Sequence, residues 1–387
     1  MFRSMITRLV LVGLTAAIVG LPEVALGLPR ATSEWVVEGH ERNASFGTSV
    51  ASAGDVNGDG YDDVVVGAPL YGPGDPGAAF LFLGSATGPS TAPDWAVWPH
   101  QAYASFGTSV ASAGDVNGDG YDDVVVGAPL YGPGDPGAAF LFLGSALGPS
   151  ATPDWTARGR QPGAWFGWSV ASAGDVNGDG YADVIVGARF YGPDDGGAAF
   201  LFLGSATGPS AAPDWAALGH QTSGELGTSV ASAGDVNDDG YDDVVVGAPL
   251  YGQGDAGAAF LFLGSAAGPS AAPDWTARGR QPGALFGWSV ATAGDVNGDG
   301  YDDVMAGASA YDEGIQFDEG GALLFLGSAT GPSGRPEWTA DGLEEQTYFG
   351  TSVASAGDVN GDGYADVLAG APGWAFEGAA FAWRGPL

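Results

Sequence analysis

The chain has 387 residues, of which 46 are acidic and 11 basic, and its formal net charge is −35. A chain this acidic repels nucleic acid and anionic membranes, so both are poor partners. It has no cysteine, which excludes disulfides, thiolate metal sites and cysteine nucleophiles. Glycine (69) and proline (25) are abundant, but they recur at fixed spacing between β-branched and aromatic runs, which argues against a low-complexity chain.

The N-terminus has the pattern of a secretory signal peptide. Arg3 and Arg8 precede an apolar run over residues 9–21, and small residues spaced for cleavage follow at Ala25 and Gly27. The run is short for a membrane span, and no later segment has 18 uninterrupted apolar residues. We expect residues 1–27 to be removed, which leaves a mature chain that is secreted, on the cell surface or periplasmic, with no membrane span. An uncleaved anchor is the alternative.

A repeat of about 60 residues dominates the rest of the chain. The segment Phe46-Gly47-Thr48-Ser49-Val50 returns in units that begin near residues 46, 106, 166, 226, 286 and 349. One spacing is 63 residues, because of an insertion around residues 312–318. Periods of this size indicate solenoids, propellers or arrays.

Each unit predicts four strands and no helix. In the first unit the strand-like runs are residues 49–55, 63–67, 78–83 and 94–97, separated by clusters of Gly, Pro, Asn and Asp. A four-stranded unit of this length is a propeller blade. The fold class is therefore all-β.

The two ends of the chain complement each other. The last unit ends after its third strand, residues 379–384, and residues 34–37 look like an isolated fourth strand. Pairing them completes six blades and leaves no open sheet edge. We expect a single domain, residues 28–387, that folds as a monomeric six-bladed β-propeller of four-stranded blades, closed by pairing the N-terminal strand with the last blade.

Each unit also carries an acidic loop between its first two strands. In the first unit Asp55, Asn57 and Asp59 hold loop positions one, three and five, Tyr61 offers its backbone carbonyl at position seven, and Asp63 holds position nine. Calcium binds six to eight hard oxygen ligands, which such a loop supplies from alternate residues. The same five positions recur as Asp115, Asn117, Asp119, Tyr121 and Asp123; Asp175, Asn177, Asp179, Tyr181 and Asp183; Asp235, Asn237, Asp239, Tyr241 and Asp243; Asp295, Asn297, Asp299, Tyr301 and Asp303; and Asp358, Asn360, Asp362, Tyr364 and Asp366. The sequence predicts about one Ca²⁺ per blade, six in all.

Variation among the loops supports this ligand set. Asp62 is replaced by Ala182 and Ala365 in two copies, so position eight is not expected to bind the metal. Position four becomes Asp238 in one copy and is expected to point outward. An EF-hand is excluded because Val66 stands where its twelfth, acidic ligand would be. A plain Asp/Asn turn without metal is the alternative.

These motifs resemble the FG-GAP repeats of the integrin alpha-subunit propeller and its bacterial relatives. Phe46-Gly47 and Gly67-Ala68-Pro69 flank the acidic loop, and the resemblance covers roughly residues 33–387. It implies a propeller with calcium between the first two strands of a blade, and extracellular adhesion or ligand recognition. The chain departs from the pattern at Leu226, Arg189 and Ser309, and the family's best-known members have seven blades.

The loops on the face opposite the acidic loops vary most between units. Trp98, His100 and Tyr103 in one unit give way to other side chains in the other units: Arg160, Gln161 and Trp165 in the next, Asp312, Glu313, Phe317 and Asp318 in the fifth, and Trp374 and Phe376 in the last. Exposed loop aromatics suit protein or glycan recognition, and unconstrained drift is the alternative. No catalytic constellation stands out, since His40, His100 and His220 hold equivalent positions. We therefore expect an adhesion or protein-interaction module and no enzyme; a lectin-like glycan binder is second, and a polysaccharide-degrading enzyme third.

Overall fold

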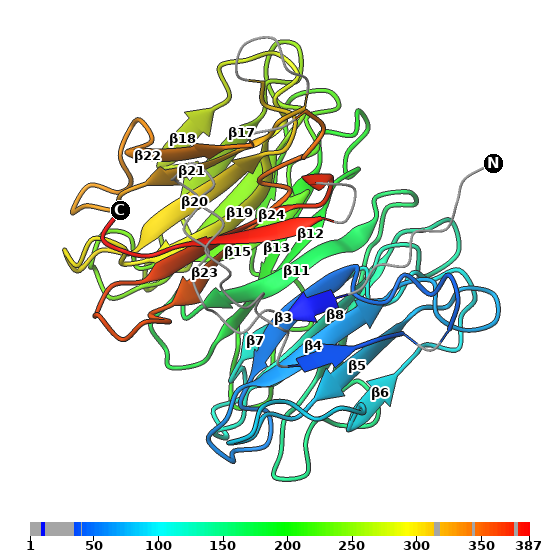
Figure 1. The fold of residues 1–387 in the computed structure, drawn as a ribbon. Coiled ribbons are helices and arrows are strands. Elements are labelled where there is room, and N and C mark those ends of the chain that lie inside the picture. The colour runs from blue at the N-terminus through cyan, green and yellow to red at the C-terminus, as the bar shows by residue number, and fades with distance from the viewer. Residues whose placement is uncertain (1–8, 12–34, 40, 313–317, 343–344, 375–377) are drawn as a thin grey trace.

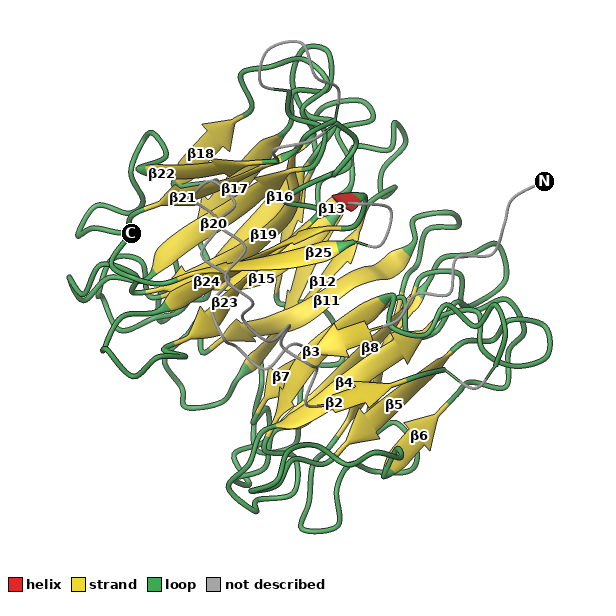
Figure 2. Cartoon of the chain, in the orientation of Figure 1, coloured by secondary structure: helices red, strands yellow, loops and turns green. Residues whose placement is uncertain are grey.

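The computed structural model describes residues 9–11, 35–39, 41–312, 318–342, 345–374 and 378–387. The elements named in these ranges are all β-strands, and loops join them at both ends of the sheets (Figure 2). Within the same ranges, no helix has the length and apolar character needed to cross a membrane. The insertion residues 313–317 and most of the expected signal peptide lie outside the described residues.

The first blade shows how each unit folds. It comprises β3 (Ser49–Gly54), β4 (Asp63–Ala68), β5 (Ala78–Phe82) and β6 (Trp95–Val97), which pair antiparallel in chain order. Strands β4 and β5 are almost wholly buried and rich in valine, alanine and phenylalanine, which favours strands packed on both faces. The four predicted strands are thus confirmed to within two residues at each end.

The other units repeat this order, and the structure confirms a six-bladed propeller (Figure 1). Their strands are β7 (Ser109–Gly114), β8 (Asp123–Ala128), β9 (Ala138–Phe142) and β10 (Trp155–Arg158); β11 (Phe166–Gly174), β12 (Asp183–Ala188), β13 (Ala198–Phe202) and β14 (Trp215–Leu218); β15 (Ser229–Gly234), β16 (Asp243–Ala248), β17 (Ala258–Phe262) and β18 (Trp275–Arg278); β19 (Phe286–Gly294), β20 (Asp303–Ala308), β21 (Gly321–Phe325) and β22 (Trp338–Asp341); and β23 (Ser352–Gly357), β24 (Asp366–Ala371) and β25 (Ala379–Trp383). We number these blades 1 to 6 in chain order.

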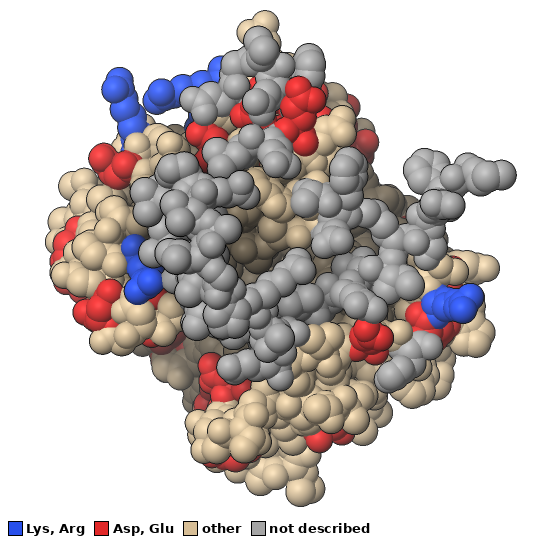
Figure 3. Space-filling model, viewed as in Figure 1, with Lys and Arg blue, Asp and Glu red and all other residues tan. Residues whose placement is uncertain are grey.

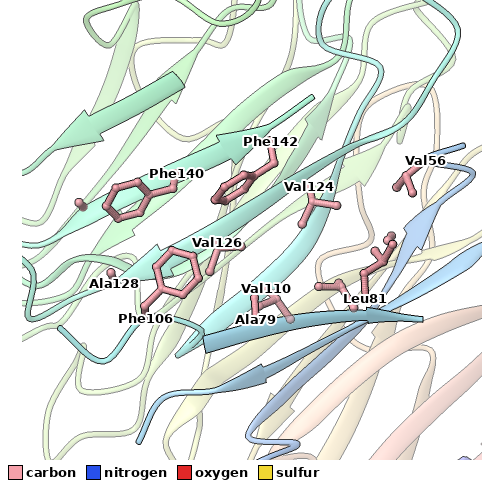
Figure 4. Close-up of a cluster of buried hydrophobic side chains, with 13 residues drawn as sticks. Val56, Ala79, Leu81, Phe106, Val110, Val124, Val126, Ala128, Phe140 and Phe142 are labelled. Carbon is pink, nitrogen blue, oxygen red and sulfur yellow. The ribbon is translucent and has the colours of Figure 1, made fainter. Parts of the chain in front are cut away.

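The hydrophobic core lies between neighbouring blades. At the first boundary Ala79 and Leu81 of blade 1 pack against Phe106, Phe140 and Phe142 of blade 2 (Figure 4). Corresponding clusters join blades 2 and 3, 3 and 4, 4 and 5, and 5 and 6. Burying one such leucine or phenylalanine contributes about 1.5–3 kcal/mol. Each blade is therefore stabilised mainly by its neighbours.

A tryptophan in each fourth strand joins its blade to the next one. The indole Nε1 of Trp95 donates a hydrogen bond to the carbonyl oxygen of Ser150 (2.9 Å), and its ring meets Phe142 edge-on at 5.1 Å. The same pair of contacts is made by Trp35, Trp155, Trp215 and Trp275. These tryptophans are therefore packing residues at the blade boundaries.

The N-terminal strand that is expected to close the ring is β2 (Trp35–Val37). Strand β2 (Trp35–Val37) pairs with β1 (Leu9–Leu11), and β25 is the last strand of a three-stranded sheet. The β1–β2 register, Leu11 opposite Trp35, is the one that Leu81 and Trp95 adopt within blade 1. Strand β1 thus holds the place that a third strand of the last blade would take. The pairing of residues 34–37 with the last blade is not among the described strand pairs and stays a prediction.

The facing surfaces of blades 6 and 1 are correspondingly open. Val50 is 40% exposed, whereas Val110, its counterpart in blade 2, is 4% exposed. Ala380 and Ala382 of β25 are exposed, although Ala79 and Leu81 at the same positions of β5 are fully buried. A cavity of about 410 Å³ lies beside β2, between Val37, Phe46 and Phe80 among others. These apolar surfaces match the ones that meet at the other blade boundaries.

Candidate metal-binding loops

The acidic loop of blade 1 winds around the first aspartate. The backbone N–H groups of Asp59 and Gly60 donate to the two carboxylate oxygens of Asp55, at 3.0 and 2.8 Å. The Oδ1 atom of Asn57 accepts from the N–H of Asp59 (2.9 Å), and Oδ1 of Asp59 accepts from the N–H of Tyr61 (3.1 Å). Loop positions one, three and five are thus brought together in one exposed turn, with their oxygens held by the backbone.

Position nine is buried behind this turn. Asp63 is fully buried; its Oδ2 accepts from the N–H of Val56 (3.0 Å) and its Oδ1 from the N–H of Gly84 (2.7 Å). This carboxylate therefore ties the acidic loop to the turn that follows β5, so the two loops lie on the same face of the propeller. The same pair of bonds is made by Asp123, Asp183, Asp243, Asp303 and Asp366.

Within the described part of the chain, none of these buried carboxylates forms an ion pair. Burial, with a smaller contribution from the nearby loop aspartates, raises the pKa of Asp123, Asp183 and Asp243 to about 7 and that of Asp303 to about 6. The groups that lower these pKa values are backbone N–H groups, and no cationic side chain is among them. A buried carboxylate surrounded by other carboxylates is costly unless a cation neutralises it.

The chemistry of the donor set fits calcium. Each loop offers only oxygen: the side chains of Asp55, Asn57 and Asp59, the carbonyl of Tyr61, and Asp63, whose carboxylate has lone pairs left after its two hydrogen bonds. Within the described ranges, no three or more His, Cys, Asp or Glu side chains are already arranged as a metal site. One predicted ligand of each loop is an asparagine, which is not among these four residue types. The carboxylate of Asp63 accepts hydrogen bonds from backbone N–H groups. The ligand assignment stays a prediction.

The structure places position eight against a neighbouring loop. Asp122, which sequence reasoning treated only as a non-ligand, accepts a hydrogen bond through Oδ2 from the backbone N–H of Asp55 in the preceding blade (2.9 Å). Nothing within a single repeat could reveal this contact, because the two residues are 67 positions apart.

The opposite loop face combines a constant backbone with changing side chains. The residue before each Phe-Gly or Leu-Gly pair has a positive φ, between 50° and 56°, yet the residues there are Ser45, Ser105, Trp165, Glu225, Leu285 and Tyr348. The left-handed conformation costs a bulky residue about 1–2 kcal/mol. The backbone conformation at this position is therefore the same in every unit, whereas the type of side chain changes.

One ion pair on this face was missed from the sequence. Arg189, which stands where most units have proline, contacts the carboxylate of Glu225, and its guanidinium lies 4.5 Å over the ring of Trp168. Trp168 in turn stacks on Trp165, with ring centroids 5.5 Å apart. Arg189 replaces the proline that most units have, and Glu225 places an opposite charge at the same blade boundary. This coincidence is the signal that could have identified the pair.

The expected exposure of the loop aromatics on this face is confirmed for Trp98 and Tyr103. Trp98 is 50% and Tyr103 66% exposed, and His100 and His220 are also exposed. Trp374 is half-buried, while His40 and Phe376 lie outside the described residues. In the view of Figure 3, acidic side chains are scattered over the outer part of the visible face, and basic ones stand at a few places on it.

Comparison with known proteins establishes the family. The FG-GAP repeat model matches residues 46–82, 106–142, 166–202, 226–262, 286–326 and 349–383, more than half of the chain. Each match runs from the Phe-Gly or Leu-Gly pair through the acidic loop to the third strand. The chain belongs to the FG-GAP repeat family and is an integrin alpha-like β-propeller.

The similar curated proteins are integrin alpha subunits. Mouse integrin alpha-IIb is 40% identical over 162 residues, which cover 39% of this chain and 16% of the relative. Integrin alpha-PS2 of Drosophila melanogaster is 34% identical over 197 residues (43% and 14%), and chicken integrin alpha-V is 33% identical over 226 residues (54% and 21%). The chain therefore spans about a fifth or less of these relatives.

Proposed function

We propose that the protein is a secreted or cell-surface, calcium-binding β-propeller that acts as an adhesion or protein-interaction module. The observation that carries calcium binding is the buried aspartate at loop position nine, which recurs in all six blades with two backbone donors and, among the described residues, forms no ion pair with a cationic side chain. The integrin alpha relatives support the adhesion role. We assign no catalytic residue.

The loop residues have distinct parts in this proposal. Asp55, Asn57 and Asp59 and their counterparts present side-chain oxygens, and the carbonyl of Tyr61 adds one more. Asp63 supplies a carboxylate ligand at position nine and also fixes the loop to the turn at Gly84. Calcium would supply the positive charge that these carboxylates lack, so its main effect is to stabilise the blades.

We place ligand recognition on the loop face opposite the acidic loops. That face carries the exposed aromatics Trp98 and Tyr103 and the positions whose side chains change from blade to blade. Exposed, rigidly held aromatic side chains are typical of binding surfaces. A protein ligand is the first candidate.

A glycan ligand is the second candidate, because Trp98 and Tyr103 offer apolar ring faces on which sugars stack. A glycan array distinguishes the two: saturable binding to defined glycans favours the lectin-like function. Release of products from polysaccharides would instead show an enzyme, which we do not expect.

Secretion follows from the proposed removal of residues 1–27. N-terminal sequencing of the protein recovered outside the cell tests it, with a first residue near Leu28 expected. A recovered chain that still carries residues 1–27 would show a retained anchor.

The adhesion role is tested by capture of extracellular proteins on the immobilised mature chain in calcium. The test variant is Trp98→Ala with Tyr103→Ala, and the control is Leu147→Ser, which changes a 97% exposed leucine on the acidic-loop face. We expect the first variant to lose the captured protein and the control to retain it. Equal capture by both variants would contradict the proposed binding face.

A further inference from the structure

The residue at loop position eight contacts the loop of the preceding blade. In addition to the 2.9 Å bond between Asp122 and Asp55, Oδ2 of Asp242 accepts from the N–H of Asp175 (2.7 Å) and Oδ2 of Asp302 from the N–H of Asp235 (3.1 Å). In each case the donor belongs to the first predicted ligand of that loop. The loops of blades 1, 3 and 4 are therefore braced by a carboxylate from the next blade.

The loops of blades 2 and 5 have the same backbone contact without the carboxylate. The N–H groups of Ala182 and Ala365 donate to the carbonyl oxygens of Asp115 and Asp295, both at 3.0 Å, as that of Asp242 does to Asp175 at 3.1 Å. The blades thus dock alike at these boundaries. The boundaries differ in one carboxylate. It is missing where alanine replaces aspartate at position eight, in Ala182 and Ala365.

The hydrogen bonds inside a loop depend on whether the bracing carboxylate is present. In the unbraced loops the residue at position four, Gly118 or Gly298, donates to Oδ1 of the first aspartate at 2.6 Å. The loop of blade 6, which has no bracing carboxylate among the described contacts, makes the same bond through Gly361 at 2.7 Å. No such bond is found in the three braced loops of the described structure. The first predicted ligand is therefore held by the neighbouring blade in the braced loops and by its own loop in the loops that lack the bracing carboxylate.

The bracing carboxylates also add charge at the predicted metal site. Asp122 is within electrostatic reach of both Asp55 and Asp115, and Asp302 of both Asp235 and Asp295. A further negative charge beside a divalent cation site strengthens binding, and calcium affinity in acidic loops depends on ligand charge and rigidity.

We propose that Asp122, Asp242 and Asp302 are positioning residues that make the loops of blades 1, 3 and 4 bind calcium more tightly than the loops of blades 2 and 5. This inference rests on the proposed calcium binding. The expected difference in Kd is about tenfold or more. Asp62 is exposed in blade 1 and would brace the blade 6 loop only if the ring closes there.

Isothermal titration of the chelator-stripped, full mature chain with calcium chloride tests it. The wild type should show two classes of sites. The variant Asp122→Asn, Asp242→Asn, Asp302→Asn should lose three tight sites, whereas Ala182→Asp with Ala365→Asp should gain two, which a merely structural role would not produce. The control is Asp75→Asn, Asp135→Asn, Asp255→Asn, which makes the same change of charge at exposed positions of the opposite face, where asparagine tolerates the positive φ.

The outcomes separate the two proposals. If the wild type binds calcium at equivalent sites, or the two loop variants leave the number of tight sites unchanged, the division into classes is wrong while calcium binding stands. If no variant and no wild-type sample binds calcium, the proposed function itself fails. Melting temperatures in excess calcium show that each variant is folded.

Discussion

The indole Nε1 of Trp155 donates a hydrogen bond to the carbonyl oxygen of Ser210, 2.9 Å away in the next blade, although 55 residues separate them in the chain. The same indole meets Phe202 edge-on, with ring centroids 4.9 Å apart. This pair represents how the propeller is assembled, because each blade is secured by a contact with its successor.

Replacing Trp155 by phenylalanine should destabilise the fold. The substitution keeps an aromatic ring but removes the donor to Ser210, and an unpaired, partly buried carbonyl costs about 1–3 kcal/mol. Urea unfolding measures the free energy. The control Trp98→Phe changes a 50% exposed tryptophan and should shift the free energy by about 0.5 kcal/mol or less. Equal effects of the two substitutions would argue against the role of Trp155 in joining the blades.

Removing calcium should lower the melting temperature. Ligand binding to the folded state alone stabilises it by RT ln(1 + [L]/Kd), about 1.4 kcal/mol per site when free calcium is ten times Kd. The measurement is calorimetry in EGTA, with EGTA saturated by calcium as the control. Identical melting curves in the two solutions would mean that the loops contribute nothing through calcium.

In the calcium-free protein, stability should fall as the pH rises. Burial raises the pKa of Asp123, Asp183 and Asp243 from the unfolded value of 3.8 to about 7. The folded state therefore binds more protons than the unfolded state between these values. The stability that this provides is fully present below about pH 4 and is lost as the pH rises through about 7. Denaturant unfolding in EGTA at several pH values measures it.

Calcium should remove that pH dependence near neutrality, because a bound cation favours the ionised carboxylates. The same unfolding series in excess calcium is the comparison. A calcium-free protein that gains stability between pH 5 and 8 would contradict the burial of uncompensated carboxylates.

Ring closure can be tested by a cross-link, since the chain has no cysteine of its own. In blade 2 Ala157 lies opposite Ala139, so closure in the same register places Val37 opposite Ala380. A mature chain with Val37→Cys and Ala380→Cys should form an intramolecular disulfide, because the exposed apolar surfaces of blades 6 and 1 are buried on closure. Ala139→Cys with Ala157→Cys is the control, for which the structure already shows the pairing.

A disulfide in the control alone would show that the ring stays open. A disulfide between two chains would instead show that blade 6 of one copy meets blade 1 of another. Mass spectrometry after non-reducing digestion separates these results.

Much of the fold could be predicted from the sequence because the repeat presents each blade six times. The strands, the packing tryptophan and the acidic loop each lie within one unit and recur in the following units. A few periods therefore suffice to identify them. The position of Trp35 against Phe82 also agrees with its assignment as a fourth strand.

The remaining features depend on contacts between units. Asp122 reaches Asp55 across a blade boundary, and Arg189 meets Glu225 36 residues later. Periodicity describes what a unit contains and says nothing about which side chains meet at its borders. The β1–β2 pairing likewise joins segments outside the repeat, where no second copy exists for comparison.

The most direct test of the account is the calcium content of the purified mature chain, measured by elemental analysis after gel filtration in calcium and after stripping with chelator. The account predicts about six ions per chain before stripping and their return on titration, with one oxygen-lined loop for each. A chain that holds no calcium under either condition would contradict it.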